Sequence, residues 1–401
     1  MFEFYRRMGK ASRRLLLICF YAFFCNGTLS LLVGSVMPDL KAAYGLSDTV
    51  SGLFMSAHST GNLIAGFISG LVPLWLGRKR GVMVMSTLAF LGYIMVLLWG
   101  APGWLFIAFL FVGLGRGSVT NFNSRMVNLL TGGSSAANNL LHGVFAIGAI
   151  VLPMVFLVLR NAISWQAGVC FVIVLGVFEE LLWSRMKLED DHPQRSDRKN
   201  STLVFMKDPA YLVLALMMFC YLCAEYTLNG WLVTYIQSKE SLTAALAASG
   251  TSMTAFSQSM AALFWVVMLI GRLVCATLSS RFSQKKMMAV CSVGMCAGFF
   301  YLTNASTVTQ VTIAVSVLGG LMAGICPMIY SDAAWYTNTY PMATSMLLGI
   351  GSIGAIAMPT IVGSLADRFG FDAGMDVILA VDVLLVVFSV LNVFIRTKRP
   401  E

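Results

Sequence analysis

The chain has 401 residues, of which 58% are hydrophobic and 11% are charged, and it carries a formal net charge of +9 at pH 7. Its mean hydropathy of +0.80 is far above that of water-soluble domains, so the composition excludes a soluble protein and indicates an integral membrane protein. No soluble domain with a basic, aromatic-rich patch occurs in the sequence, so the net charge predicts contact with anionic lipid and no binding of nucleic acid.

Apolar stretches of membrane-spanning length recur along the whole chain. A helix needs about 20 apolar residues to cross the hydrocarbon core, and stretches near that length predict twelve spans. In chain order they centre on residues 14–36, 51–72, 82–98, 103–130, 139–159, 167–183, 211–236, 251–280, 287–302, 308–330, 342–365 and 373–395. A β-barrel requires short alternating segments, and runs such as 173–178 do not alternate. We therefore predict an all-α membrane protein.

Basic residues gather in alternate connections between these spans. If the amino terminus is cytoplasmic, 20 of the 27 Lys and Arg residues lie on the cytoplasmic side. Only four fall on the opposite side, namely Lys41, Arg160, Lys239 and Arg368. This distribution follows the positive-inside rule and predicts a multi-pass protein of the cell (inner) membrane with both termini cytoplasmic. The first apolar segment lacks an evident cleavage site, so we expect a retained first helix.

The sequence repeats itself at an offset of 206 residues. Residues 143–153 of the fifth span match residues 349–359 of the eleventh, and the same offset superimposes Gly113 on Gly319. We therefore predict two pseudo-symmetric six-helix bundles, residues 1–184 and 209–401, joined by a cytoplasmic linker at residues 185–208 that we expect to be a solvated loop. Parallel repeats of this kind are typical of rocking transporters.

Glycines and prolines recur at equivalent places in the fifth and eleventh spans. Kinked helices can bend when two bundles rock, and static close packing explains the same residues equally well. The candidate gating or hinge positions are Gly143, Gly148, Pro153, Gly349, Gly354 and Pro359.

Nothing in the sequence predicts catalysis or a bound cofactor. All nine cysteines lie in predicted spans, where we expect reduced core residues. Cys220 and Cys223 form a CxxC without further ligands at suitable spacing, so no metal site is expected. Phosphate-binding glycine loops, zinc-protease motifs and activated nucleophiles are missing from the sequence, and we therefore expect no enzyme.

A carboxylate, Glu225, lies inside the seventh predicted span. Charges at such positions are costly and mark polar pathways. A carboxyl group in these surroundings can exchange its proton as substrate binds, which makes Glu225 the first candidate for proton coupling. A neutral structural carboxyl or an ion-pair partner is the alternative. His142 is a second candidate because an imidazole titrates near physiological pH, although the sequence favours the alternative of a hydrogen-bonded histidine near a helix start.

Across all twelve spans the chain resembles the major facilitator superfamily. The loop signature of that family is half present at residues 70–79, where Leu74 and Trp75 stand in place of the usual aspartate and basic residue. A better copy, residues 363–370, follows the eleventh span. The patterns at residues 141–153, 221–235 and 264–272 are similar to the fucose/galactose/glucose proton symporter branch. That resemblance implies monosaccharide uptake driven by a proton or, in some relatives, by sodium.

The resemblance also implies that the first, fourth, seventh and eighth spans face a central cavity. A sugar must exchange water for amides, carboxylates and aromatic faces. The candidate substrate-binding residues of these spans are Asn26, Arg116, Asn121, Asn123, Tyr221, Asn229, Trp231, Gln258 and Trp265. Packing between helices is the alternative for each of them. Arg116 can pair with Glu225 or with an anionic substrate, and the sequence leaves both open.

We therefore predict a monomeric secondary active transporter that moves a small hydrophilic solute, a monosaccharide, by alternating access with proton coupling. The alternative is a transporter of an organic anion or a drug-like, amphipathic molecule, with Arg116 as counter-ion. A receptor or scaffold of the same fold that has lost transport is a third reading of the same sequence.

Overall fold

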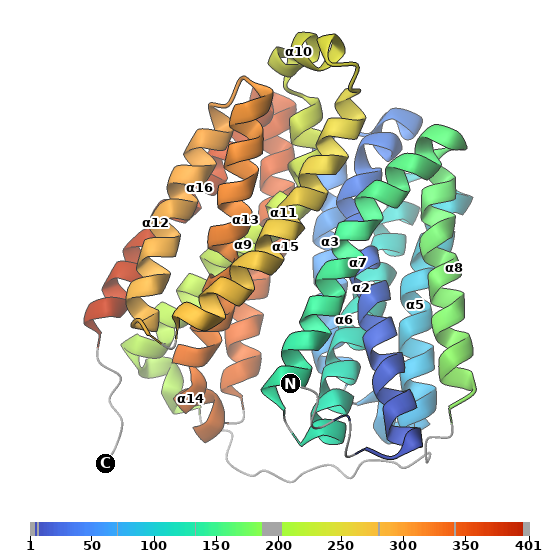
Figure 1. Ribbon diagram of the computed structural model, residues 1–401, viewed down its shortest axis with the longest axis vertical. Helices are drawn as coiled ribbons and strands as arrows, with labels where there is room; N and C mark the ends of the chain where they lie inside the picture. Colours follow the sequence, from blue (N-terminus) through green and yellow to red (C-terminus); the bar gives the residue numbers. More distant parts are fainter. Residues whose placement is uncertain are drawn as a thin grey trace. The chain divides into compact units, whose positions relative to one another are not determined.

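The computed structural model describes residue 5 and residues 8–69, 71–132, 134–186, 203–279, 281–340 and 342–395. Within these ranges it contains twelve helices of 20 residues or more and no strand (Figure 1). The six of the first half are α2 (Lys10–Tyr44), α3 (Asp48–Ile68), α5 (Arg78–Leu98), α6 (Pro102–Thr131), α7 (Ser135–Ala162) and α8 (Trp165–Ser184). The six of the second half are α9 (Pro209–Gln237), α11 (Met253–Leu278), α12 (Gln284–Thr303), α13 (Val308–Asp332), α15 (Ala343–Phe369) and α16 (Phe371–Phe394). The prediction of an all-α protein is confirmed.

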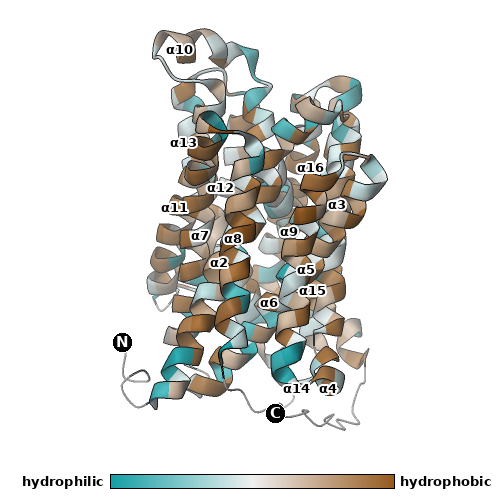
Figure 2. Cartoon of the chain, turned by 90° about the vertical axis from the view of Figure 1, so that its right-hand side faces the viewer, coloured by the Kyte–Doolittle hydropathy of each residue, from teal (hydrophilic) through white to brown (hydrophobic). Residues whose placement is uncertain are grey.

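Eleven of these helices are long and apolar enough to cross a membrane. The twelfth, α3, covers the predicted second span but is less apolar, because Ser56, His58, Ser59, Thr60 and Asn62 interrupt its apolar residues. Figure 2 shows hydrophobic residues along most of the long helices and hydrophilic residues near many helix ends.

Short helices that hydropathy did not predict lie between the spans. They are α4 (Val72–Leu76), η1 (Leu203–Lys207), η2 (Glu240–Leu242), α10 (Thr243–Ala248) and α14 (Ala334–Thr339). Each has six residues or fewer, which is far below the length that a hydropathy window detects.

The chain forms two compact units. Unit 1 comprises residues 1–46 and 53–196, and unit 2 comprises residues 47–52 and 197–401. The first turn of α3 therefore groups with unit 2, and the rest of that helix groups with unit 1. Residues 187–202, which make up most of the predicted linker, lie outside the described residues.

The sequence repeat is also a repeat of helix packing. In unit 1, α2 packs on α7 and α5 packs on α6, and in unit 2, α9 packs on α15 and α12 packs on α13. A Cβ atom added to Gly113 would lie 1.9 Å from the carbonyl oxygen of His58, and one added to Gly319 would lie 2.6 Å from that of Phe264. Both the glycines and their neighbours are 206 residues apart. Equivalent glycines thus permit the close α3–α6 and α11–α13 crossings.

Two equivalent lysines bind the end of the last long helix in each unit. Lys79 Nζ donates to the carbonyl oxygens of Ser184 and Met186, each at 2.8 Å. Lys285, 206 residues later, donates from Nζ to the carbonyl oxygen of Ile395 at 2.9 Å. The last carbonyl groups of a helix lack partners within the helix and attract cations. The two equivalent lysines therefore have the same structural role in both units.

The second copy of the loop signature forms the last turns of α15. Its Asp367 carboxylate accepts hydrogen bonds from the backbone N–H groups of Asp48 and Thr49, at 2.8 and 2.7 Å, and from Thr49 Oγ1 at 2.6 Å. These groups belong to the first turn of α3, where a negative charge is favourable. The helix ends at Gly370, whose φ of 89° suits glycine and lets α16 begin at once.

Large apolar side chains are exposed on the long helices of both units. Examples are Leu98 (69% exposed), Val158 (64%), Val290 (70%) and Phe394 (78%). Apolar exposure of this extent is typical of a surface that contacts lipid.

Candidate substrate and proton sites

In unit 1, Arg116 on α6 is held by side chains from three other helices. Its Nε donates to Ser30 Oγ on α2, and its Nη1 donates to Asn62 Oδ1 on α3 at 3.4 Å. The guanidinium carbon lies 5.9 Å from the ring centroid of Phe145 on α7. A planar guanidinium supported by a hydroxyl, an amide and an aromatic face is well suited to bind a polar ligand.

The glycines around Arg116 explain why the neighbouring helices come so close. A Cβ atom added to Gly115 would lie 2.3 Å from the Ala89 backbone nitrogen, and one added to Gly117 would lie 2.8 Å from the Asn62 carbonyl oxygen. Small residues of this kind bring helix backbones together in membranes. They place the Asn62 side chain within reach of Arg116.

Asn26 lies close to this group on α2. It is 1% exposed, and its Nδ2 donates to Thr120 Oγ1 on α6 at 2.7 Å. The backbone carbonyl oxygen of Asn26 accepts a hydrogen bond from Ser30 Oγ, and Ser30 links Asn26 to Arg116. Within the described part of the chain, Asn26 Oδ1 is buried without a hydrogen-bond partner. Burying such an acceptor costs about 1–3 kcal/mol, and a hydroxyl group of a bound solute would satisfy it.

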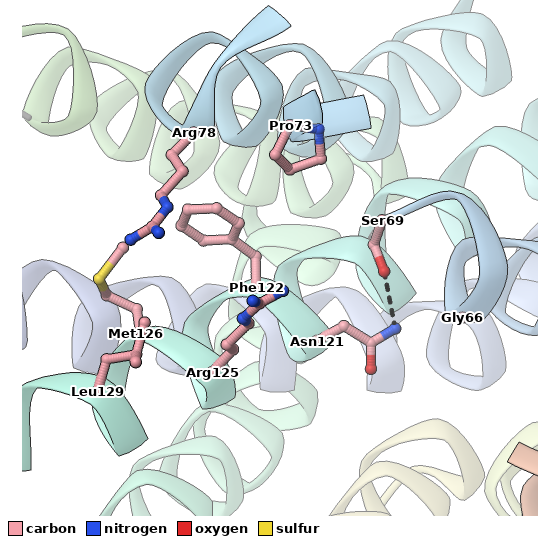
Figure 3. Close-up of a pocket in the computed structure, with 9 residues that line it drawn as sticks. All are labelled: Gly66, Ser69, Pro73, Arg78, Asn121, Phe122, Arg125, Met126 and Leu129. Atoms are coloured by element: carbon pink, nitrogen blue, oxygen red, sulfur yellow. Dashed lines mark hydrogen bonds between the residues drawn. The ribbon is translucent and has the colours of Figure 1, made fainter. Parts of the chain in front are cut away.

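The other unit 1 candidates contact groups outside the surroundings of Arg116. Asn121 is exposed, and its Nδ2 donates to Ser69 Oγ at 3.3 Å (Figure 3). Asn123 is fully buried and donates to the carbonyl oxygen of Val119 on its own helix. His142 is exposed on α7, with its ring centroid 5.7 Å from that of Phe23.

In unit 2, Glu225 is half-buried near the middle of α9. The Tyr221 hydroxyl, one turn earlier, is a hydrogen-bonding neighbour of its carboxylate. Arg272 on α11 lies within electrostatic reach of Tyr221, and Cys326 on α13 lies within reach of both Glu225 and Arg272. Three helices therefore bring a carboxylate, a guanidinium, a phenol and a thiol together.

Trp265 connects this group to Asn229. Its Nε1 donates to Asn229 Oδ1 at 3.1 Å, and the Arg272 guanidinium carbon lies 5.9 Å from its ring. Arg272 is not among the candidate residues predicted from the sequence, so its position beside Trp265 was missed. The available signal was the spacing, because seven residues separate it from Trp265 and place both on one helix face.

The remaining unit 2 candidates are buried in helix packing. Trp231 is 0% exposed, its Nε1 donates to the carbonyl oxygen of Pro359 at 3.0 Å, and its ring centroid lies 5.3 Å from that of Phe371. It joins α9 to α15 and α16 in this conformation. Gln258 on α11 is 1% exposed.

Two of the predicted hinge glycines pack closely against a neighbouring helix, and two do not. Gly148 packs against the Phe24 carbonyl oxygen of α2, and Gly354 packs against Cys223 and Phe219 of α9. Added Cβ atoms at the first glycines of the two repeats, Gly143 and Gly349, would meet nothing within 4 Å. Helices α7 and α15 continue through Pro153 and Pro359.

Comparison with models of protein families shows which family the chain belongs to. The model of the Major Facilitator Superfamily matches residues 19–260 and, in a second match, residues 241–401. The chain belongs to the major facilitator superfamily. The coarse prediction of a membrane transporter is thereby confirmed. The fucose/galactose/glucose branch stays a prediction.

Relatives of this transporter are distant in sequence. The membrane protein MosC of Rhizobium meliloti is 22% identical over 389 residues, covering 95% of this chain and 91% of MosC. The crystal structure of the nucleoside transporter NupG is similar with a TM-score of 0.77 at 13% identity, covering 96% of this chain and 100% of that chain. The structure of FucP in the outward conformation has a TM-score of 0.62 at 17% identity, covering 95% and 99%. These structures support the major facilitator fold alone.

Proposed function

We propose that the chain is a proton-coupled transporter that moves a small hydrophilic solute by alternating access. The observation that carries this proposal is a polar group inside each unit. Arg116 lies with its partners in unit 1, and in unit 2 Glu225 shares Tyr221 and Cys326 with Arg272 as electrostatic neighbours. Ionisable residues within membrane spans are costly and mark substrate and ion pathways. The orientation with both termini cytoplasmic in the cell (inner) membrane, and the monomeric state, belong to the same proposal.

A monosaccharide is the proposed solute class. Within unit 1, Asn26 offers a buried acceptor and Arg116 offers a donor fork. Within unit 2, Trp265 offers an aromatic face and donates its N–H to Asn229. Sugar hydroxyls both donate and accept hydrogen bonds, so they match the polar groups of either unit. A neutral ligand also avoids the desolvation cost of a buried extra charge.

Glu225 is the proposed proton carrier. Glu225 and Arg272 share Tyr221 and Cys326 as electrostatic neighbours, and we infer that protonation of the carboxyl weakens its attraction to the guanidinium. The guanidinium and the Tyr221 hydroxyl then become available to a solute. Proton binding and solute binding are in this way coupled through one group of side chains.

The test uses purified protein in two steps. A thermal-shift screen with hexoses and organic acids first identifies a ligand, because binding to the folded state raises the apparent melting temperature. Uptake of that ligand into proteoliposomes is then measured with an imposed pH gradient. We expect Glu225→Gln to retain exchange and to lose accumulation. Asp382→Asn is the matched control, because Asp382 is another buried carboxyl of unit 2, on α16. Undiminished accumulation by Glu225→Gln, or equal loss in both variants, contradicts the assignment.

The second candidate function is transport of an organic anion. It is favoured by the guanidinium of Arg116 inside a membrane span, which Ser30 and Asn62 help to hold in place. In this case the screen yields an organic acid whose binding is lost in Arg116→Gln, and hexoses have no effect. Retained binding of the acid by that variant excludes Arg116 as its counter-ion.

A further inference from the structure

The two units differ in charge at one pair of equivalent positions. In unit 2, the Asp332 carboxylate on α13 lies 3.9 Å from Lys285 Nζ and accepts a hydrogen bond from Asn392 Nδ2 at 2.8 Å. The offset of 206 places Met126 of α6 at the position of Asp332, and Lys79 at that of Lys285. This register holds because Gly113 and Gly319, on the same two helices, make equivalent crossings. Unit 1 therefore lacks the carboxylate that unit 2 carries at this place.

Two arginines occur in unit 1 where unit 2 has uncharged residues. Arg78, at the start of α5, is equivalent to Gln284, and Arg125 on α6 is equivalent to Ser331. At these three positions unit 1 therefore carries two guanidinium groups and no carboxylate, whereas unit 2 carries one carboxylate and no guanidinium.

These residues line a cavity. A hollow of about 210 Å³ lies among α3, α4, α5 and α6, and Arg78, Arg125 and Met126 form part of its wall (Figure 3). Ser69 and Asn121 contribute polar groups to the same wall, and none of the nine lining residues carries a carboxylate. A space of this size holds several water-sized groups. The cavity is thus polar, cationic and large enough for an oxyanion.

The position of the cavity suits a lipid headgroup. It lies where α3 ends at Ile68 and α5 begins at Arg78, which is the boundary of the membrane-spanning part of unit 1. Leu129 at its edge is 58% exposed, and Trp75 of α4 is 76% exposed. Basic pockets between helices at this level bind anionic headgroups. Apolar side chains beside them contact the acyl chains of the same lipid.

We propose that this cavity binds a phosphate oxyanion, carried by an anionic phospholipid or present as free inorganic phosphate. Guanidinium groups bind phosphate through paired, charge-assisted hydrogen bonds, and Ser69 and Asn121 add hydroxyl and amide groups. The bound anion supplies from outside the negative charge that Asp332 supplies within unit 2. The proposal is independent of which solute the protein transports.

The test measures the melting temperature of the purified full-length protein in detergent. Phosphatidylglycerol, phosphatidylcholine, sodium phosphate and sodium chloride are added separately, the two salts at equal ionic strength. We expect phosphatidylglycerol to raise the melting temperature more than phosphatidylcholine and sodium chloride do, whether or not sodium phosphate has the same effect. A response to phosphatidylglycerol alone identifies the lipid as the source, and a response to phosphate as well shows that the free ion suffices.

Two variants and one control connect the response to the cavity. Arg125→Gln, at an exposed position, removes one guanidinium, and Met126→Asp introduces the carboxylate found at the equivalent place in unit 2. Each is expected to weaken the anion response at least tenfold in the concentration required. Met126→Leu, the matched control, keeps the wild-type response. The proposal is overturned if neither anion stabilises the wild-type protein, or if the response persists unchanged in Arg125→Gln. Lipid retained in native mass spectra of Arg125→Gln at wild-type level overturns it equally.

Discussion

Gly113→Ala tests the close crossing of α3 and α6. The added Cβ would lie 1.9 Å from the carbonyl oxygen of His58 and 2.7 Å from its carbonyl carbon, whereas ordinary contact begins at 3.4 Å. These are backbone atoms of a neighbouring helix, so no side chain can rotate away. The helices must separate by roughly 1.5 Å at the crossing, and overpacking of this kind costs about 1–3 kcal/mol. Gly319→Ala, at 2.6 Å from the Phe264 carbonyl oxygen, requires a smaller separation of α11 and α13.

The assay is thermal unfolding of the purified variants in one detergent, followed by fluorescence. We expect Gly113→Ala to melt lowest, Gly319→Ala next, and wild type above both. Gly143→Ala is the matched control, because it lies in a helix where an added Cβ meets nothing within 4 Å. The control is expected to melt at or slightly above the wild-type temperature, since alanine favours helix over glycine. Equal melting temperatures for Gly113→Ala and Gly143→Ala would refute the close crossing.

Four further substitutions address helix ends and the substrate site. Asp367→Asn removes the charge that holds the first turn of α3. We expect a loss of about 1 kcal/mol of local stability, measured as faster amide hydrogen exchange at Thr49. Exchange at the wild-type rate there would contradict the contact. Lys79→Met and Lys285→Met each remove a cation from the carboxyl end of a helix. We expect faster amide hydrogen exchange that is confined to the last turn of α8 or α16, respectively. Unchanged exchange in both variants would contradict the structural role of these lysines. Arg116→Lys keeps the charge and loses the planar fork, so solute affinity is expected to fall at least tenfold with little change in melting temperature, and unaltered affinity would exclude Arg116 from the site.

Hydropathy was sufficient to predict the membrane-spanning helices because each must satisfy its own backbone hydrogen bonds in lipid. The length of each span can therefore be estimated from the length of its apolar stretch in the sequence. The 206-residue repeat went further, since it paired Gly113 with Gly319, and the structure places both at equivalent helix crossings. Repeated backbone contacts leave a sequence signal because only glycine permits them.

The composition of the two polar groups was less accessible to sequence reasoning. Arg272 meets Trp265 and the surroundings of Glu225 only because α11 and α13 pack beside α9, and a single sequence does not state which helices are neighbours. Trp231 shows the opposite case. An aromatic residue inside a span serves a binding site or helix packing equally well, and here its ring and N–H are used in packing against α15 and α16.

The central claim, that solute and proton move together through a site containing Glu225, is tested most directly by proton flux. Proteoliposomes containing a pH-sensitive dye are given an inward gradient of the solute found in the thermal-shift screen, with no pH gradient imposed. The account predicts acidification of the lumen by the wild-type protein, and solute entry without acidification by Glu225→Gln. Solute entry without any pH change in the wild type, or acidification by Glu225→Gln at the wild-type rate, would contradict it.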